Sequence, residues 1–535
     1  MSIRFKPLRV LSLALGVLIA FTTSAYDLEL DGIYYKIYNS SYSKYAVVTF
    51  KDNTYNSYSG DVVIPPTVIY NDVEFNVTTI GPNAFYKCTD LNTVTVPNTV
   101  DYIGLESFKN SSLRQISLPN SVTMISSNAF SGCTNLTNIV FPPSLKTIHV
   151  GAFEDCTGLT SVQFPSSLTS LLSGAFARCT GLTSVYIPAT ITEITGNPFQ
   201  GCYNLQRIVV SEDNPYYDSR DGCNAIIKKE GNILMSPCPN TIIPETVRGI
   251  GFKAYADQPY ITSIDLPDSL SIIESNAFEK CTALTSITIP DPVRVIERWA
   301  FAYDSNLLTV NLPDSLESIG YAAFAYCYKM PSIHLPNSIT HLDSQVFWVC
   351  SNLASCNIPT SMTAIPHGTF YNCTHMDNVF IPNNIKTIGT NCYESCVYMT
   401  NLTIGSGVES FTYRTFSNNY RLLNISCKAV VPPSISSDVF HENSYNQGTL
   451  YVRKKSVQAY READVWCNFQ NIVGVDFPVD INGDGVMSIQ DVTALIDLLL
   501  TDEPITDLEM DANGDGVVGI GDLTEIIDML LCADL

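Results

Sequence analysis

Two acidic stretches near the C-terminus have the residue types and the spacing of calcium-binding loops. The first, DINGDGVMSIQD, occupies 480–491, and the second, DANGDGVVGIGD, occupies 511–522. A tight loop can direct about six to eight hard oxygen ligands inward from positions 1, 3, 5, 7, 9 and 12, while glycine makes the sharp turn at position 6. The expected ligands are Asp480, Asn482, Asp484, Val486 (carbonyl), Ser488 and Asp491 in the first loop, and Asp511, Asn513, Asp515, Val517 (carbonyl) and Asp522 in the second.

The two loops are 31 residues apart, and their alignment favours two structural calcium ions over acidic turns that bind no metal. Ser488 could orient a water at position 9 of the first loop. Gly519 replaces it in the second loop, so the second site is expected to be weaker or to use water. Each loop is followed by an amphipathic helix, in which Val492, Leu495, Ile496 and Leu499 match Leu523, Ile526, Ile527 and Leu530.

The loops depart from a complete EF-hand in two respects. Position 12 is Asp rather than Glu, and the residues FPVD leave no room for a helix before Asp480. In these features residues 476–535 resemble the duplicated F-hand of a type I dockerin. The resemblance implies a small all-α domain that binds calcium in order to fold and docks through its helices onto a cohesin domain. It also implies that Ile489-Gln490 and Ile520-Gly521, at positions 10 and 11, help to choose the partner. They differ from the Ser-Thr pair common in clostridial dockerins.

No other residue pattern indicates catalysis or a bound cofactor. Five of the six histidines stand at different phases of the repeat described below, and no GxSxG or HExxH motif is present. No pair of CxxC motifs has the spacing of a zinc site. We therefore predict that the chain is not an enzyme, although a catalytic triad is a spatial arrangement that sequence order does not reveal.

The residues that precede the calcium loops form a repeat with a period of 23. A large aromatic residue, called the anchor below, recurs at intervals of 23 apart from one of 22 and one of 56, and the long interval is one period plus 33 residues. The fourteen anchors are Phe85, Phe108, Phe130, Phe153, Phe176, Phe199, Tyr255, Phe278, Phe301, Phe324, Phe347, Phe370, Tyr393 and Phe416. A second marker is a proline that follows each short apolar run: Pro97, Pro119, Pro142, Pro165, Pro188, Pro244, Pro267, Pro290, Pro313, Pro336, Pro359 and Pro382.

The spacing within one unit predicts a short strand that ends at the marker proline. Apolar residues stand six, three and one positions before the proline and three, six and eleven positions after it. Proline ends a strand because it has no N–H to donate to the ladder. A unit of this length cannot bury its own apolar face, whereas stacked units share one core. The repeat therefore predicts a β-rich solenoid.

The unit reads L-x-x-[VI]-x-[ILF]-P-x-x-[VIL]-x-x-[IL]-x-x-x-A-F-x-x-C over residues 67–425. This pattern resembles the short leucine-rich repeats of BspA-type bacterial surface proteins. The segments YDLELDGIYYKIY (26–38) and SGDVVIPPTV (59–68) are similar to the mature N-terminus of such proteins from the Bacteroidales. The resemblance implies a leucine-rich-repeat solenoid, a location at the cell surface, and adhesion to a protein or a glycan.

The repeat accounts for most of the seventeen cysteines. Ten stand three positions after an anchor: Cys88, Cys133, Cys156, Cys179, Cys202, Cys281, Cys327, Cys350, Cys373 and Cys396. We expect small buried thiols in one column. Disulfides between adjacent rungs are the alternative, but parallel Cβ vectors suit that bond poorly. Cys223 and Cys238 are the best disulfide candidates, since both lie in an insertion outside the repeat.

The insertion covers 211–243 and predicts a hairpin around Glu230-Gly231 that loops out on one face of the solenoid. Residues 26–66 alternate and are rich in tyrosine, which indicates an N-terminal β cap. Residues 426–475 lose the period and predict a closing cap with Trp466 and Phe469 as its buried anchors. Caps are needed because the end rungs would otherwise expose apolar core and free strand edges.

The slot two positions before each marker proline should point outward from the strand. This outward row holds Thr95, Ser117, Val140, Gln163, Tyr186, Asp265, Thr288, Asn311, His334, Asn357, Phe380 and Thr403. Exposed rows on solenoids are natural contact surfaces, and aromatic residues dominate binding hot spots. Tyr186, His334 and Phe380 are therefore the first candidates for ligand contact. The alternative is ordinary variation on the surface of a sheet.

The N-terminus predicts export from the cytoplasm. Residues 1–25 combine Arg4, Lys6 and Arg9 with a short apolar run and a small-residue cleavage site, as a signal peptide does. No apolar run is long enough to span a membrane. Formal charge is −23, which argues against a nucleic-acid partner because phosphate binding needs clustered Lys and Arg.

Two functions remain open from the sequence. The first is a secreted or cell-surface interaction protein whose solenoid binds a protein or glycan ligand and whose calcium module tethers it. The second is a non-catalytic component of a cohesin–dockerin assembly in polysaccharide breakdown, where the solenoid would target substrate or act as a spacer. Direct glycosidase activity has no supporting motif.

Overall fold

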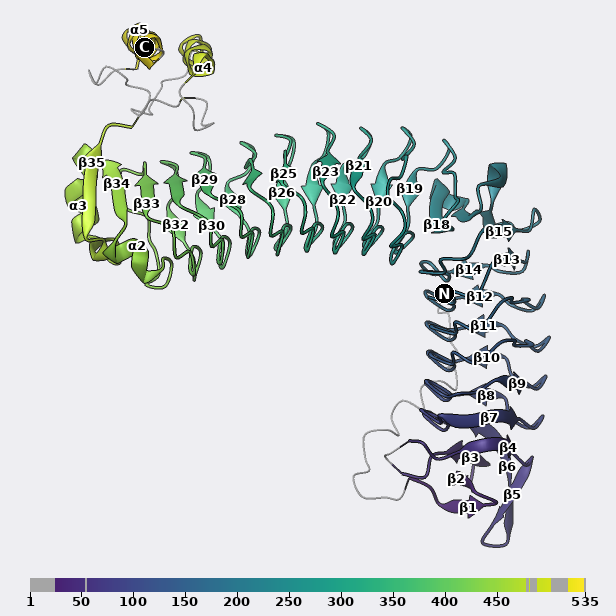
Figure 1. The fold of residues 1–535 in the computed structure, drawn as a ribbon. Helices are drawn as coiled ribbons and strands as arrows, with labels where there is room; N and C mark the ends of the chain where they lie inside the picture. The colour runs from purple at the N-terminus through teal and green to yellow at the C-terminus, as the bar shows by residue number, and fades with distance from the viewer. Residues whose placement is uncertain (1–24, 53–54, 478–480, 482–487, 502–517, 534–535) are drawn as a thin grey trace, which may run out of the picture. The chain divides into compact units, whose positions relative to one another are not determined.

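The computed structural model describes residues 25–52, 55–477, 481, 488–501 and 518–533 (Figure 1). The chain divides into two compact units, Met1–Ser219 and Arg220–Leu535. Most of each unit is a stack of rungs, each of which carries short strands joined by turns (Figure 1). The predicted β-solenoid is therefore confirmed, and its parallel strands pair with partners about one period along the chain.

The first unit begins with the predicted β cap. Strands β1 (Leu28–Leu30), β2 (Ile33–Asn39) and β3 (Lys44–Thr49) are antiparallel, and β5 (Thr67–Tyr70) pairs with β6 (Val73–Ile80) in a hairpin. Strand β6 then starts ladder A, a parallel series of two-residue strands. Its further strands in this unit are β8 (Tyr102–Ile103), β10 (Met124–Ile125), β11 (Thr147–Ile148), β12 (Ser170–Leu171) and β14 (Glu193–Ile194).

A second parallel series, ladder B, contains the strands that end at the marker prolines. In the first unit it holds β4 (Ser59–Val63), β7 (Asp90–Thr95) and β9 (Gln115–Ser117), and then β13 (Ser184–Ile187) and β15 (Arg207–Val210). Strand β16 (Tyr217–Asp218) ends the unit. Successive rungs keep register residue for residue, as in Val185 beside Ile208.

The second unit repeats both ladders. Ladder A comprises β19 (Gly249–Ile250), β20 (Ile272–Ile273), β22 (Val295–Ile296), β24 (Ser318–Ile319), β26 (His341–Leu342), β28 (Ala364–Ile365), β30 (Thr387–Ile388) and β32 (Ser410–Phe411). Ladder B comprises β21 (Ser286–Thr288), β23 (Thr309–Asn311), β25 (Ser332–Ile333), β27 (Ser355–Cys356), β29 (Asn378–Ile381), β31 (Asn401–Ile404), β33 (Asn424–Cys427), β34 (Thr449–Arg453) and β35 (Asn471–Val475).

The insertion forms the predicted hairpin but is not a peripheral loop. After η2 (Arg220–Gly222), strands β17 (Ala225–Lys228) and β18 (Ile233–Pro237) are antiparallel across η3 (Glu230–Asn232), where Gly231 supplies a φ of 78°. Strand β18 pairs in parallel with β19. The apolar second strand of the hairpin is fully buried and continues ladder A.

The closing cap differs from the expected β cap because it also contains helices. Short helices α2 (Glu442–Asn446) and α3 (Val457–Glu462), with η4 (Lys454–Ser456) and η5 (Trp466–Asn468), accompany β34 and β35. Trp466 and Phe469 are buried as predicted, and the Trp466 indole N–H donates to Pro433 O at 2.8 Å. The last two helices of the chain are α4 (Ile489–Leu499) and α5 (Ile520–Ala533). No described helix is long and apolar enough to cross a membrane.

The core of each unit is a column of anchor rings. Neighbouring rings within a unit are nearly parallel, and their centroids are between 4.8 and 5.9 Å apart. This spacing follows the rung separation, which is about 4.8 Å in β structure. Phe440 extends the column beyond Phe416, at 5.6 Å. The sequence did not predict Phe440 as an anchor, because it lies 24 residues on, where the repeat pattern is lost.

Candidate functional site

The outward row lies where the sequence places it, on the outer side of ladder B. Nine of its twelve side chains are exposed, and Asn357, Phe380 and Thr403 are half-buried. Tyr186 on β13 is 54% exposed, His334 is exposed just after β25, and the Phe380 ring on β29 has Lys428 Nζ 5.6 Å from its centroid. Tyr186 belongs to the first unit, whereas His334 and Phe380 belong to the second, where the rung of Asn357 stands between them.

A different surface is built by the turns around the anchors. In nearly every rung the residues two before and two after the anchor have positive φ, between 53° and 72°. Glycine and asparagine suit this left-handed conformation, whereas other residues lose roughly 1–2 kcal/mol. The first unit uses Asn83, Asn110, Asn128 and several glycines at these slots. The fold therefore dictates the backbone of the turn and favours small side chains there.

Three successive rungs of the second unit break this preference. Trp299 and Tyr303 occupy the two left-handed slots around Phe301, and Tyr326 and Val349 occupy the second slot of the next two rungs, with φ from 57° to 65°. Two of the three tryptophans of the chain lie in these turns. The residues form a half-buried group of rings, which we call the turn-face aromatic cluster: Trp299, Tyr303, Tyr321, Tyr326, Trp348 and Tyr371.

The rings of the turn-face aromatic cluster are in contact from rung to rung. The Tyr303 and Tyr326 rings stack at 4.4 Å with an interplanar angle of 8°. Trp348 is tilted by 56° against both Tyr326, at 5.1 Å, and Tyr371, at 6.4 Å. Tyr328, which is 40% exposed, adds an edge-on contact to Tyr326 at 6.0 Å. The result is a continuous aromatic surface that runs along the stack.

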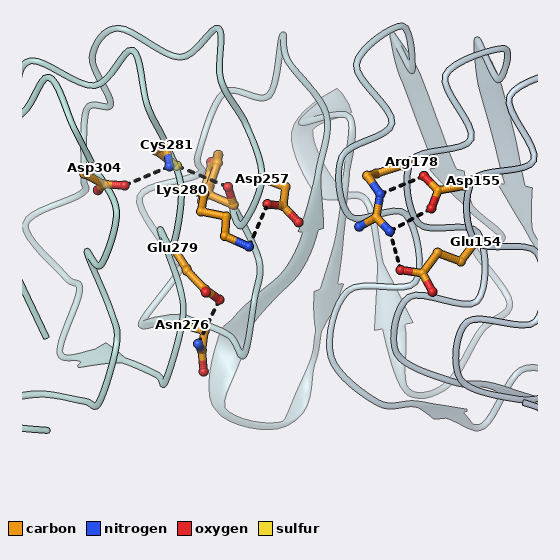
Figure 2. A network of polar contacts seen from close by, with 10 residues as sticks. Glu154, Asp155, Arg178, Asp257, Asn276, Glu279, Lys280, Cys281 and Asp304 are labelled. Carbon is orange, nitrogen blue, oxygen red and sulfur yellow. Dashed lines mark hydrogen bonds and ion pairs between the residues drawn. The ribbon is translucent and has the colours of Figure 1, made fainter. Parts of the chain in front are cut away.

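The polar partners of the cluster are amide, hydroxyl and imidazole groups. The Tyr321 hydroxyl donates to Gln345 Oε1, and Gln345 Nε2 lies 3.5 Å from His367 Nε2. Lys280 Nζ lies 5.9 Å from the Tyr303 centroid and 3.8 Å from Asp257 Oδ1 (Figure 2). The cluster thus combines apolar rings with amide, hydroxyl and imidazole hydrogen-bonding groups.

Elsewhere the same turn slots carry ion pairs. In the first unit Arg178 Nε donates to Asp155 Oδ1 at 2.8 Å, and Nη2 pairs with Glu154 (Figure 2). Half-exposed pairs of this kind stabilise a protein by at most about 1 kcal/mol. The sequence signal for the aromatic cluster was available in the columns two before and two after the anchor. Hydrophobic periodicity gives no signal for those columns, because their residues are set by backbone conformation.

The cysteine column is buried as expected, and each thiol also has a hydrogen-bonding role. The Sγ of Cys133 donates to Phe108 O at 3.0 Å, and the pattern recurs in both units, for example from Cys350 to Phe324 O. None of the sixteen described cysteines forms a disulfide, Cys223 and Cys238 included, so the suggested disulfide is not formed. Burial raises the pKa of Cys133 to about 12, which keeps it a thiol without nucleophilic character.

Four rungs place another side chain in the cysteine slot, namely Ser111, Gln258, Asp304 and Asn419. Asn419 Nδ2 donates to Tyr393 O at 3.0 Å, as a thiol would. Asp304 is fully buried, and its Oδ1 accepts from Cys281 N at 2.7 Å (Figure 2). Its Oδ2 has no hydrogen-bond partner among the described residues. Burial is the main cause that raises the pKa of the Asp304 carboxyl well above its ordinary value.

Only part of each predicted calcium loop is described. Asp480, Asn482, Asp484, Val486, Asp511, Asn513, Asp515 and Val517 lie outside the described residues. Asp491 is fully buried; its Oδ1 accepts from Ile481 N and its Oδ2 from Ser488 N, both at 2.7 Å. Asp522 is also fully buried and accepts from Gly519 N at 2.6 Å. The Ser488 hydroxyl accepts from Gln490 N and so caps α4.

Helices α4 and α5 pack together through Val492, Leu495 and Ile526, with Leu499, Leu523 and Leu530 around them. Ile496 and Ile527, which the sequence groups with this apolar stripe, are 39% and 37% exposed. The four candidate docking residues are all exposed: Ile489 (68%), Ile520 (77%), Gln490 and Gly521. Equivalent isoleucines thus stand uncovered at the start of each helix.

The comparisons with known proteins concern the repeat. The family described as BspA type leucine rich repeat region matches residues 78–206, 235–354, 295–424 and 344–460. A leucine-rich repeat protein from Bacteroides ovatus is similar in structure, with 22% identity, a TM-score of 0.38, and coverage of 84% of this chain and 100% of that chain. A leucine rich cell surface protein from Faecalibacterium prausnitzii has 21% identity, a TM-score of 0.36, and coverage of 76% and 95%.

A third similar structure is the pneumococcal vaccine antigen PcpA, with 18% identity and a TM-score of 0.40. The match covers 85% of this chain and 100% of that chain. No curated protein matches this chain.

Proposed function

We propose that this chain, which belongs to the BspA-type leucine-rich-repeat family, is a secreted or cell-surface interaction protein without catalytic activity. Its solenoid binds a protein or glycan ligand. Its C-terminal helices, held by two calcium loops of the dockerin kind, tether it to a cohesin-like partner. The observation that carries the proposal is that the outward row is not needed by the core. Its side chains are mostly exposed and of many types on a rigid, repeated backbone.

The calcium part of the proposal is supported by the chemistry of the described donors. Calcium prefers carboxylate and carbonyl oxygens, and the Asp491 and Asp522 carboxylates are buried at equivalent places in the first turns of α4 and α5. Burying a carboxylate is unfavourable unless hydrogen bonds or a cation compensate it. With the seven other oxygen-bearing side chains and two carbonyls of the loops, these residues would hold two structural ions.

The tether is supported by the uncovered faces of the helix pair. Leu500 is 78% exposed in addition to Ile489 and Ile520, and interfaces commonly bury such apolar residues. A second candidate function is a non-catalytic component of a cohesin–dockerin assembly that breaks down polysaccharide. The turn-face aromatic cluster favours this candidate, because aromatic surfaces with neutral polar groups suit sugar rings.

Calcium titration of the full chain by calorimetry tests the calcium part. We expect two bound ions in the natural chain and one in each of Asp491→Ala and Asp522→Ala. Asp497→Ala is the matched control, since Asp497 is an exposed carboxylate on α4 outside the loop, and it should still bind two ions. Binding of no calcium by the natural chain would refute the proposal of calcium loops.

Docking is tested by capture of a cohesin domain on the full chain, with calcium and with chelator. We expect capture with calcium only. The double variant Ile489→Asp/Ile520→Asp should lose capture, because two charges replace the apolar contacts, and it should keep both calcium ions. Equal capture with chelator, or undiminished capture by the double variant, would contradict docking through these helices.

A further inference from the structure

The turn-face aromatic cluster lies outside the column of anchor rings that fills the core of the second unit. Anchor rings fill the core of every rung. In most other turns the left-handed slots are occupied by Asn, Gly, Lys or Asp. Trp299, Tyr303 and Tyr326 sit in a backbone conformation that disfavours large side chains. Residues held in unfavourable conformations gather at functional sites, and here they gather in adjacent rungs.

We infer that the turn-face aromatic cluster binds an uncharged polysaccharide chain. The inference rests on the proposed function, since it names the ligand class and the place of binding on the solenoid. A pyranose ring has an apolar C–H face and a rim of hydroxyl groups. The first packs against aromatic faces, and the second hydrogen-bonds to groups such as the Tyr321 hydroxyl, the Gln345 amide and the His367 imidazole.

The arrangement fits a long ligand rather than a single sugar. Rings follow one another from Tyr303 through Tyr326 and Trp348 to Tyr371 over four rungs, with centroid steps of 4.4, 5.1 and 6.4 Å. A ligand that lies along this line contacts each rung in turn. Tyr and Trp side chains lose little conformational entropy on binding because they have only two rotatable side-chain bonds, and here they are already packed against one another.

The lack of charge on the cluster and the negative charge of the chain favour a neutral glycan over an acidic one. The six residues of the cluster carry no formal charge, and Lys280, which lies over the Tyr303 ring, pairs with Asp257. The chain as a whole has a formal charge of −23, which repels anionic polymers at low salt. A cluster that recognised sulfated or uronic-acid glycans would instead need clustered Lys or Arg.

The test is affinity electrophoresis of the full chain in gels that contain hydroxyethylcellulose, xyloglucan, galactomannan or mixed-linkage β-glucan. Polygalacturonate serves as the anionic comparison. We expect at least one neutral polysaccharide to slow the natural chain and polygalacturonate not to slow it. Tyr326→Asn and Trp348→Ala should each weaken binding by about tenfold, as loss of one stacking ring does in other aromatic sites.

Two features keep the test independent of folding. Asparagine is favoured at the slot of Tyr326, so Tyr326→Asn should keep the circular dichroism and melting temperature of the natural chain. Tyr413→Ala is the matched control, because Tyr413 occupies the slot of Tyr321 three residues before its own anchor, is 56% exposed and lies outside the cluster. Its polysaccharide affinity should be unchanged.

Intrinsic fluorescence gives a second readout. Trp299 and Trp348 belong to the cluster, whereas Trp466 is fully buried in the closing cap. The bound polysaccharide should protect the first two from acrylamide quenching, and the protection should shrink in Trp348→Ala.

The inference is overturned if none of the neutral polysaccharides slows the natural chain, or if Tyr326→Asn and Trp348→Ala bind as tightly as the natural chain. Solid-phase binding to purified matrix proteins separates this failure from that of the proposed function. Binding to such a protein that Tyr186→Ala weakens would overturn the cluster as the ligand site and leave the interaction function standing. If the chain binds neither neutral polysaccharides nor matrix proteins, both the further inference and the proposed function are wrong.

Discussion

The turns of the two units share a backbone but not a surface. In both units the residues on either side of the anchor take the left-handed conformation. Both units fill these slots with Asn, Gly and ion-paired side chains, such as Arg178 in the first and Lys280 in the second, and the second unit adds the aromatic residues Trp299, Tyr303 and Tyr326. The fold therefore requires the left-handed backbone on either side of the anchor but does not determine which side chain stands there.

The core shows the opposite relation. Phe130 and Phe324 are both fully buried and stack on their neighbours in the same way. The core columns are thus alike in the two units, and the turn faces differ. The shared fold accounts for the buried rings in both units. The difference between the turn-face side chains needs an explanation other than the fold.

The largest expected effect tests the likeness of the two cores. Phe130→Ala and Phe324→Ala should each lower the free energy of unfolding by about 3–5 kcal/mol, because a cavity replaces a buried ring. Urea unfolding followed by circular dichroism measures it, and Val140→Ala, at a side chain that is 65% exposed, is the control. A loss in only one unit would mean that the two cores are not equivalent.

The next effect concerns Asp304, which has no counterpart in the cysteine column of the first unit. Asp304→Asn should stabilise the chain at pH 7.5 by about 1–3 kcal/mol, because an amide can donate where the carboxylate Oδ2 lacks a partner. Asn419 already fills the same slot in this way. Melting temperatures of this variant and of Asp314→Asn, at an exposed aspartate, provide the measurement and its control.

The pH dependence of the same variant has a definite sign. Burial raises the pKa of Asp304 in the folded chain above the ordinary value of 3.8, so the folded chain holds a proton that the unfolded chain releases. The stability that Asp304 contributes is complete below the ordinary pKa and is lost as the pH rises through the folded value. The gain from Asp304→Asn should therefore be larger at pH 8 than at pH 4, and an equal gain at both would contradict a raised pKa.

The sequence predicted the columns that face the core because hydrophobicity marks them. Anchors such as Phe324, the slots around each proline and the buried thiols all recur with the period, so stacking follows directly. The same reading predicted that Tyr186 and His334 point outward. In the closing cap the period is lost, so neither Phe440 nor the short helices α2 and α3 carried a signal.

The turn-face aromatic cluster escaped prediction for a physical reason. Its residues are defined by backbone conformation, and a slot such as that of Tyr326 holds Lys, Asn, Gly, Asp or Arg in other rungs. The periodicity of hydrophobic residues gives no signal for such a column. The hydrogen bond from Cys133 to Phe108 O was missed likewise, because a small apolar slot and a donor slot look the same when cysteine fills both.

The smallest expected effect decides whether the two turn faces differ for structural reasons. Asn110 and Tyr326 occupy the same left-handed slot, two after the anchor, with φ of 58° and 63°. Asn110→Tyr should lower the free energy of unfolding by about 1–2 kcal/mol. Tyr326→Asn should change it by less than about 1 kcal/mol, since relief of the backbone offsets the lost ring contacts. If thermal unfolding instead shows that Tyr326→Asn destabilises as much as Asn110→Tyr, the stacked rings themselves stabilise the second unit, and the aromatic surface needs no ligand to explain it.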